Sequence, residues 1–181
     1  ARQSKIIVDG TIIANGTMDK PIVFRGDRLD FILDILPTTA HRTMEGIVFN
    51  NESFDNIFNN VIVRNGNNGI TCKASDPEKS KLKINNSQIT NMDGNVLTAT
   101  NCNLEAANSE FTNATVDVVV LNGGNIALHI VHLQTTSLPK AGIRNLKKVK
   151  PVIPYNYLTI IQIQIKRSCH MIYYKPISTI V

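Results

Sequence analysis

The chain has 181 residues, of which 43% are hydrophobic and 18% are charged, and its formal net charge is +5. This length and apolar content suffice for one domain with a sizeable core, and the absence of any run of 18 apolar residues argues against a transmembrane segment. The three cysteines have no paired spacing, so neither a disulfide framework nor a zinc site is indicated.

Charge is divided unevenly along the chain. The segment 1–117 holds all 14 Asp and Glu and 11 of the 19 Lys and Arg, whereas the segment 118–181 holds the other 8 Lys and Arg and no acid. A segment of that length without an acidic side chain is unusual for a globular protein. We therefore predict a folded domain over residues 1–135 and a basic C-terminal extension over residues 136–181.

Three short β-type segments are predicted near the N-terminus. Residues 6–8, 11–14 and 21–24 are rich in Ile and Val, and the turn-forming pairs Asp9-Gly10 and Asn15-Gly16 separate them. Two hairpins and the first coil of a solenoid explain this local pattern equally well. The repeat further along the chain favours the coil.

A long segment without repeat character lies between Gly26 and Gly46. It is too long for a turn, and insertions of this kind in solenoids often project from the binding face. Its charged residues and two carboxylates that follow it are the predicted binding residues, namely Asp27, Arg28, Asp30, Asp34, His41, Arg42, Glu52 and Asp55. We expect no catalytic residue, no cofactor and no metal ion. The oxygen-rich loop at residues 50–59 lacks the ligand spacing of an EF-hand. Residues 73–81 are a charged loop between coils, and both loops are expected to be solvated surface.

The repeat occupies the centre of the chain. The motif NSQITN at positions 86–91 returns as NSEFTN at positions 108–113, and a looser copy around Val63 precedes both at a slightly longer spacing. Periods of about 20 to 50 residues indicate stacked units, and short β-type runs between Asn, Gly and Asp make each unit a coil of strands. The predicted fold is all-β, a single-stranded right-handed parallel β-helix (β-solenoid) of about 4–5 coils.

Asparagines of the repeat recur in register. Stacked coils would align them in ladders, because a side-chain amide both donates and accepts a hydrogen bond. Asn that only marked turns would need no fixed register. The predicted ladder residues are Asn60, Asn65, Asn86, Asn91, Asn108 and Asn113.

Beyond Leu121 the repeat weakens. Ile126, Leu128 and Leu133 keep the spacing of the two close copies, but the ladder positions no longer carry Asn. Three explanations of the basic extension stay open: it binds an anionic polymer or membrane surface, it caps the open end of the solenoid, or it is read out of frame and does not belong to the fold. The last is favoured, because the acidic residues disappear where the repeat is lost.

Residues 7–17, 21–28 and 45–49, together with the Asn-x-x-Phe/Ile/Val-x-Asn motifs, resemble exported bacterial right-handed parallel β-helix repeat proteins. These are the surface-protein type of the pectate-lyase-like superfold. The resemblance covers roughly residues 5–125 and concerns fold rather than chemistry. It implies an extracellular or cell-surface location, an N-terminal truncation, and divergence after about residue 125.

The predicted function is a non-enzymatic scaffold that presents loops to a glycan or a surface protein. The resemblance also implies an alternative, a polysaccharide lyase or glycoside hydrolase, which would need several carboxylates and an Arg converging in a groove. Whether the protein is an enzyme is left open, with the scaffold favoured. Nucleic acid is not expected as a partner, and the oligomeric state is not predicted.

Overall fold

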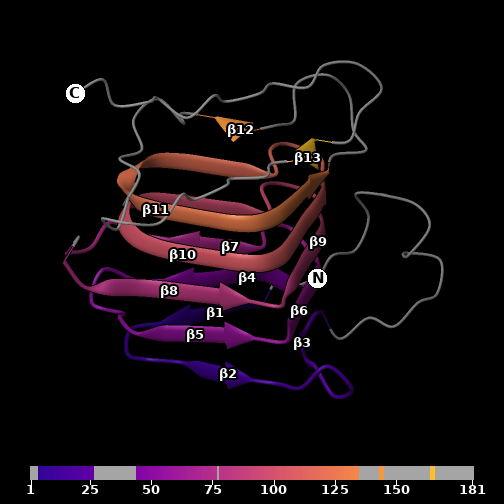
Figure 1. Ribbon diagram of the computed structural model, residues 1–181, viewed down its shortest axis with the longest axis horizontal. Coiled ribbons are helices and arrows are strands. Elements are labelled where there is room, and N and C mark those ends of the chain that lie inside the picture. Colours follow the sequence, from indigo (N-terminus) through magenta and orange to yellow (C-terminus); the bar gives the residue numbers. More distant parts are fainter. Residues whose placement is uncertain (1–3, 27–43, 77, 135–142, 145–163, 166–181) are drawn as a thin grey trace, which may run out of the picture.

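The computed structural model describes residues 4–26, 44–76, 78–134, 143–144 and 164–165. Regular structure in these ranges consists of β-strands: β1 (Ser4–Val8), β2 (Ile13–Asn15), β3 (Ile22–Phe24), β4 (Met44–Phe49), β5 (Asn56–Asn59), β6 (Val61–Gly66), β7 (Ile70–Cys72), β8 (Ser80–Asn85), β9 (Gln88–Met92), β10 (Leu97–Ala114), β11 (Val119–Gln134), β12 (Ile143–Arg144) and β13 (Gln164–Ile165). The strands pair in parallel and stack as a β-solenoid of about four turns (Figure 1). The predicted all-β solenoid is confirmed.

Each coil contributes strands to three faces. On the first face β1, β4 and β7 stack below β10, on the second face β2, β5 and β8 do so, and on the third face β3, β6 and β9 do so. β10 and β11 each pass through all three faces, and they pair with each other along almost their whole length. Because β1, β2 and β3 pair with β4, β5 and β6, the first coil is confirmed and the hairpin alternative is wrong.

The core consists of columns of apolar side chains that repeat from coil to coil. Each column takes one inward-facing position per strand, as alternation along a β-strand requires. The three columns are Ile47, Ile70, Leu97 and Val119; Ala14, Phe58, Ile84, Ala106 and Leu128; and Val63, Ile89, Phe111 and Leu133. All are buried, and each coil therefore depends on its neighbours for its core.

The repeated Asn residues lie at the corners between faces. All six predicted ladder residues have positive φ, between 46° and 60°, in the left-handed region that Asn tolerates better than most residues. Asn113 donates a hydrogen bond to the side chain of Asn91, and Asn91 donates to Asn65 at 3.2 Å. Asparagine side chains therefore connect successive coils as well as turning the chain.

The second ladder differs from the prediction at Asn60. Asn108 donates to Asn86 at 2.6 Å, but Asn86 then donates to Asn59 at 3.0 Å, and Asn59 donates to Asn15 at 3.0 Å. Asn60 stacks on Gly16, which has no side chain to bond, and its amide donates to the Gly16 carbonyl at 3.2 Å. The ladder therefore passes through the preceding residue in the second coil.

The Ser and Thr of the repeated motif also have structural roles. The backbone amide of Ser87 donates to the Ser109 hydroxyl at 3.2 Å, and the amide of Val61 donates to the Ser87 hydroxyl at 3.0 Å. Thr112 donates to Thr90 across the coils at 2.9 Å. The two serine hydroxyls satisfy buried backbone amides, and the threonine hydroxyls link neighbouring coils, so the recurrence of the whole motif rather than of Asn alone has a structural reason.

Past Leu121 the weakened repeat still forms a full coil. Ile126, Leu128 and Leu133 pair with Leu104, Ala106 and Phe111, at the predicted spacing. β12 and β13 pair in parallel with β11. The other residues of the predicted extension over 136–181 lie outside the described residues, and its three explanations stay predictions.

Within the described ranges no helix has the length and apolar character needed to cross a membrane.

Candidate functional site

The corner loop between β4 and β5, residues 50–55, carries two of the predicted binding residues. Glu52 and Asp55 are both exposed there. Asp55 has a φ of 54° and donates its backbone amide to the carbonyl of Ser80 at 2.8 Å. The two carboxylates therefore project from a corner whose backbone is held by the next coil.

Buried polar side chains fix this corner loop from inside. The Ser53 hydroxyl donates to the carbonyl of Gly10 at 2.7 Å, and the Asn56 amide donates to the Ser53 hydroxyl and to the carbonyl of Lys81, each at 2.8 Å. Ser53 and Asn56 are fully buried, so the expectation that residues 50–59 are solvated surface is wrong for them. A loop tied to the coils on both sides is preorganised for binding.

Lys81 lies directly beneath the corner loop and is also fully buried. Its ammonium group donates to the carbonyls of Asn50 and Asn51, the second at 3.3 Å. The expectation of a solvated loop over residues 73–81 is wrong at this position. Burial lowers the pKa of Lys81 from its ordinary value, whereas Cys72, Cys102 and Glu52 act to raise it.

A β-bulge explains why Lys81 points inward. Simple alternation would place Lys81 on the same outer surface as Lys83, which is exposed. However, the register between β8 and β10 shifts between Ser80 and Leu82, and a bulge of this kind redirects a side chain. Lys81 and Leu82 are consequently buried in succession.

Phe54 provides an aromatic surface in the same corner. Its ring is half-buried, and the ammonium groups of Lys79 and Lys81 lie 4.8 Å and 5.3 Å from the ring centroid. These distances are typical of cation–π contacts. The corner thus combines an aromatic ring, exposed carboxylates and lysine charge.

Two free cysteines lie close to Lys81, and sequence reasoning missed this grouping. Cys72 and Cys102 are both fully buried and free, and the neighbouring Cys102 thiol together with burial raises the pKa of Cys72 well above its ordinary value. Their separation along the chain matches neither spacing of the repeat, so nothing in the sequence pattern brings them together. The sequence pattern does not predict the bulge at Lys81 either.

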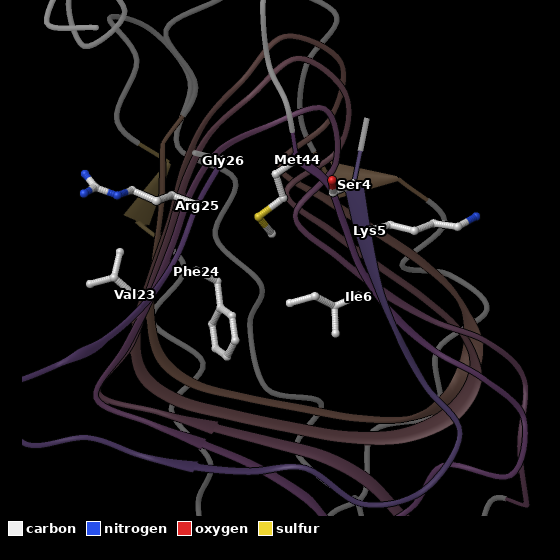
Figure 2. Close-up of a pocket in the computed structure, with 8 residues that line it drawn as sticks. All are labelled: Ser4, Lys5, Ile6, Val23, Phe24, Arg25, Gly26 and Met44. Atoms are coloured by element: carbon white, nitrogen blue, oxygen red, sulfur yellow. The ribbon is translucent and has the colours of Figure 1, made fainter. Parts of the chain in front are cut away.

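A second feature is a cavity of about 330 Å³ at the first coil. Figure 2 shows Ile6, Phe24 and Met44 directed into the interior of the coil, whereas Lys5 and Arg25 point away from each other to the outside. The cavity is an apolar continuation of the core, and the separated cations do not form an anion site. Its lining residues are Ser4, Lys5, Ile6, Val23, Phe24, Arg25, Gly26 and Met44.

Six of the predicted binding residues, Asp27, Arg28, Asp30, Asp34, His41 and Arg42, lie outside the described residues. Met44, which follows this segment directly, begins β4, whereas Glu52 and Asp55 lie beyond the other end of that strand. β4 has six residues and spans about 17 Å at the usual rise per residue. That all eight predicted binding residues share one binding edge therefore stays a prediction.

Among the described residues no three His, Cys, Asp or Glu side chains are grouped as a metal site would require. The fold and this corner define the protein as a parallel β-solenoid with a fixed polar loop at one corner. In comparisons with known proteins, no family model, no curated protein and no solved structure matches the chain.

Proposed function

We propose that the protein is a non-enzymatic extracellular or cell-surface scaffold whose corner loops bind a glycan or a surface protein. The observation that carries this proposal is the corner loop over residues 50–55, in which exposed Glu52 and Asp55 flank Phe54 on a backbone held by buried hydrogen bonds. Parallel stacking supplies the rigidity that a binding loop needs, because β4 and β5, which flank this loop, are each paired with strands of both neighbouring coils.

A glycan is the favoured ligand class for this loop. Carboxylates accept hydrogen bonds from sugar hydroxyls, and an aromatic ring packs against the apolar face of a sugar. Glu52, Asp55 and Phe54 supply both kinds of contact within one short loop. A loop with these groups fixed in advance loses little conformational entropy on binding.

A glycan-array screen with the full chain tests the proposal. We expect binding to a subset of glycans, with affinity reduced about 10-fold or more by Glu52→Gln or Asp55→Asn, because each loses a hydrogen bond to a charged group. Asp55→Asn is conservative, since Asn also tolerates the positive φ at this position. The matched control is Asp19→Asn, an exposed carboxylate in the turn between β2 and β3.

The same samples separate a scaffold from the enzymatic alternative. A scaffold should leave bound polysaccharide intact, with no release of reducing ends over the incubation. Release of reducing sugar that Glu52→Gln abolishes would instead support a lyase or hydrolase. Equal binding by the corner variants, the control and the unmodified protein would remove the corner loop from the proposal.

A further inference from the structure

The first coil of the solenoid combines unpaired strand edges with exposed apolar side chains. Of the five large hydrophobic residues that are exposed in the described ranges, four belong to this coil, namely Ile7, Ile13, Met18 and Val23. Among the described strands, β1, β2 and β3 each pair only with the second coil, on one edge. An apolar strand whose other edge is unpaired offers a site where a further β-strand can add.

The opposite end of the solenoid is partly covered. β12 pairs with Val119 and Val120 of β11, and β13 pairs with His132 and Leu133. Figure 1 shows both strands at the end of the stack that lies away from β2. Head-to-tail stacking of copies would need this last coil to be free along its edge. A contact between two first coils has no such obstacle among the described residues.

β1 presents alternate residues to its free edge. The carbonyl of Val8 accepts a hydrogen bond from the Asn50 amide of the second coil at 2.9 Å. Backbone groups alternate in direction along a strand, so the amides of Lys5, Ile7 and Asp9 face away from β4. The side chains of these three residues are exposed. The free edge therefore displays a cation, an apolar side chain and an anion in that order.

This order is self-complementary when two copies of β1 meet in antiparallel orientation. With Ile7 opposite Ile7 of the second copy, Lys5 of each copy lies opposite Asp9 of the other, in pairs whose backbone groups face each other. Opposite charges at such positions stabilise a sheet and like charges destabilise it. Sliding one strand by two residues would separate the charges, and sliding it by four would bring like charges together. One register is therefore favoured.

The same register continues the apolar interior across the contact. Ile6 and Val8 alternate with the outward-facing residues, and Figure 2 shows Ile6 directed into the coil. Antiparallel pairing about Ile7 places Ile6 of each copy opposite Val8 of the other. The cavity of about 330 Å³ at the first coil is lined in part by Ile6, so the second copy would cover it.

The other two faces of the first coil agree with this arrangement. A two-fold axis that passes through the middle of β1 brings β2 of each copy against β3 of the other. The exposed residue at the centre of β2 is Ile13, and that at the centre of β3 is Val23. Apolar side chains would therefore meet on these two faces as well.

We infer that the partner of the first coil is a second copy of this chain, in an isologous dimer formed by antiparallel pairing of β1 about Ile7. Lys5 and Asp9 of each copy form reciprocal ion pairs. The Asn50 amide donates to the Asp9 carboxylate at 2.6 Å and holds it beside the strand edge. This inference does not depend on the proposed binding of a glycan or a surface protein.

Sedimentation velocity of the full chain over a concentration series tests the dimer. We expect a reversible species with twice the mass of the chain. Lys5→Glu would place a carboxylate opposite Asp9, and Asp9→Lys would place an ammonium group opposite Lys5. Each variant alone should therefore raise the dimer Kd about tenfold or more.

Mixing the two variants gives the sharpest comparison. In a mixed dimer one chain carries two carboxylates and the other two ammonium groups at the paired positions, so both ion pairs form again. The mixture, and the double variant K5E/D9K alone, should recover the Kd of the unmodified protein to within about threefold. Recovery in the mixture also shows that each single variant is folded.

A matched pair of variants locates the apolar part of the contact. Ile7→Lys brings two ammonium groups together on the two-fold axis and should raise the Kd at least as much as the charge reversals. Val116→Lys is the control, because Val116 is 44% exposed and Ile7 is 51% exposed, but Val116 lies between β10 and β11. It should leave the Kd unchanged.

Hydrogen exchange of the Ile7 amide reports the contact directly. Its exchange should slow as the concentration is raised, because the amide is hydrogen-bonded only in the dimer. The amide of Ile57 bonds to the carbonyl of Ile12 within the stack at 3.0 Å, and its exchange should not depend on concentration.

Two results would overturn the inference. One is a chain that stays monomeric throughout the series: a protected Ile7 amide would then mean that another segment of the same chain covers the edge, and an unprotected one that the edge is open. The other is a dimer whose Kd is the same for Lys5→Glu, Asp9→Lys and the unmodified protein, which would place the contact elsewhere.

Discussion

Replacing Phe58 with alanine should lower the free energy of unfolding by about 4 kcal/mol, as expected when a fully buried aromatic side chain is truncated. The Phe58 ring stacks on Phe24 with centroids 5.5 Å apart and meets Phe49 edge-on at 5.8 Å. It is completely buried in one core column, between Ala14 and Ile84. Its loss leaves a cavity that the paired coils on either side are unable to close. Equilibrium denaturation followed by circular dichroism measures the change.

Ile13→Ala is the matched control for Phe58. Ile13 belongs to the adjoining strand β2, on the same face, but it is 63% exposed, and its truncation should cost less than about 1 kcal/mol. The difference between the two variants reports burial rather than β-propensity. A cost for Phe58→Ala as small as that of the control would mean that the ring is not enclosed between coils.

We expect the side-chain hydrogen bonds of Asn91, and not only its turn conformation, to stabilise the fold. It donates to Asn65 and accepts from Asn113, and its φ is 60°. Asn91→Gly keeps the turn accessible but loses both ladder bonds, and should cost about 2 kcal/mol. Asn91→Ala adds the strain of a left-handed alanine and should cost about 3 kcal/mol. Urea titration of the three proteins gives the comparison.

Asn101→Gly provides the reference for the corner itself. Asn101 is an exposed corner residue with a φ of 41°, and the equivalent corner of the next coil is already glycine, Gly123. This substitution should change stability by no more than about 0.5 kcal/mol. If Asn91→Gly is equally neutral, asparagine serves these corners only as a turn residue, and the ladder bonds contribute nothing measurable.

The repeat made the register of the fold predictable. Residues that recur at one position of a coil must stack, so the spacing of the two close copies fixed the pairing of Ile89 with Phe111 and extended it to Leu133. The longer spacing of the first copy located Val63 in the same column. The apolar periodicity and the Asn positions therefore predict the architecture, because equivalent positions in successive coils have the same burial and the same turn conformation.

Features that break the repeat were not predictable from it. Lys81 is buried because a bulge adds one residue to β8, and a bulge leaves no mark in the alternation of neighbouring side chains. Asn86 bonds Asn59 rather than Asn60, whose amide donates to the Gly16 carbonyl one coil below. Cys72 and Cys102 are both buried, on opposite sides of the corner at Asn101, and their separation along the chain matches neither spacing of the repeat.

The candidate site was only partly accessible to sequence reasoning. Glu52 and Asp55 were identified as exposed carboxylates on a polar loop, and the structure places both on one corner. The buried supports of that corner, Ser53, Asn56 and Lys81, are polar residues that composition alone assigns to solvent. Their roles emerge only when the coils above and below are in place.

The most direct test of the account is a nuclear Overhauser spectrum of the isotope-labelled full chain. Parallel stacking places Ile89 between Val63 and Phe111 on neighbouring strands about 4.8 Å apart. We expect backbone cross-peaks that link Ile89 to both residues, although each lies a full coil away along the chain. Cross-peaks that instead join each strand to the next one along the chain in antiparallel order would contradict the solenoid and the site built on it.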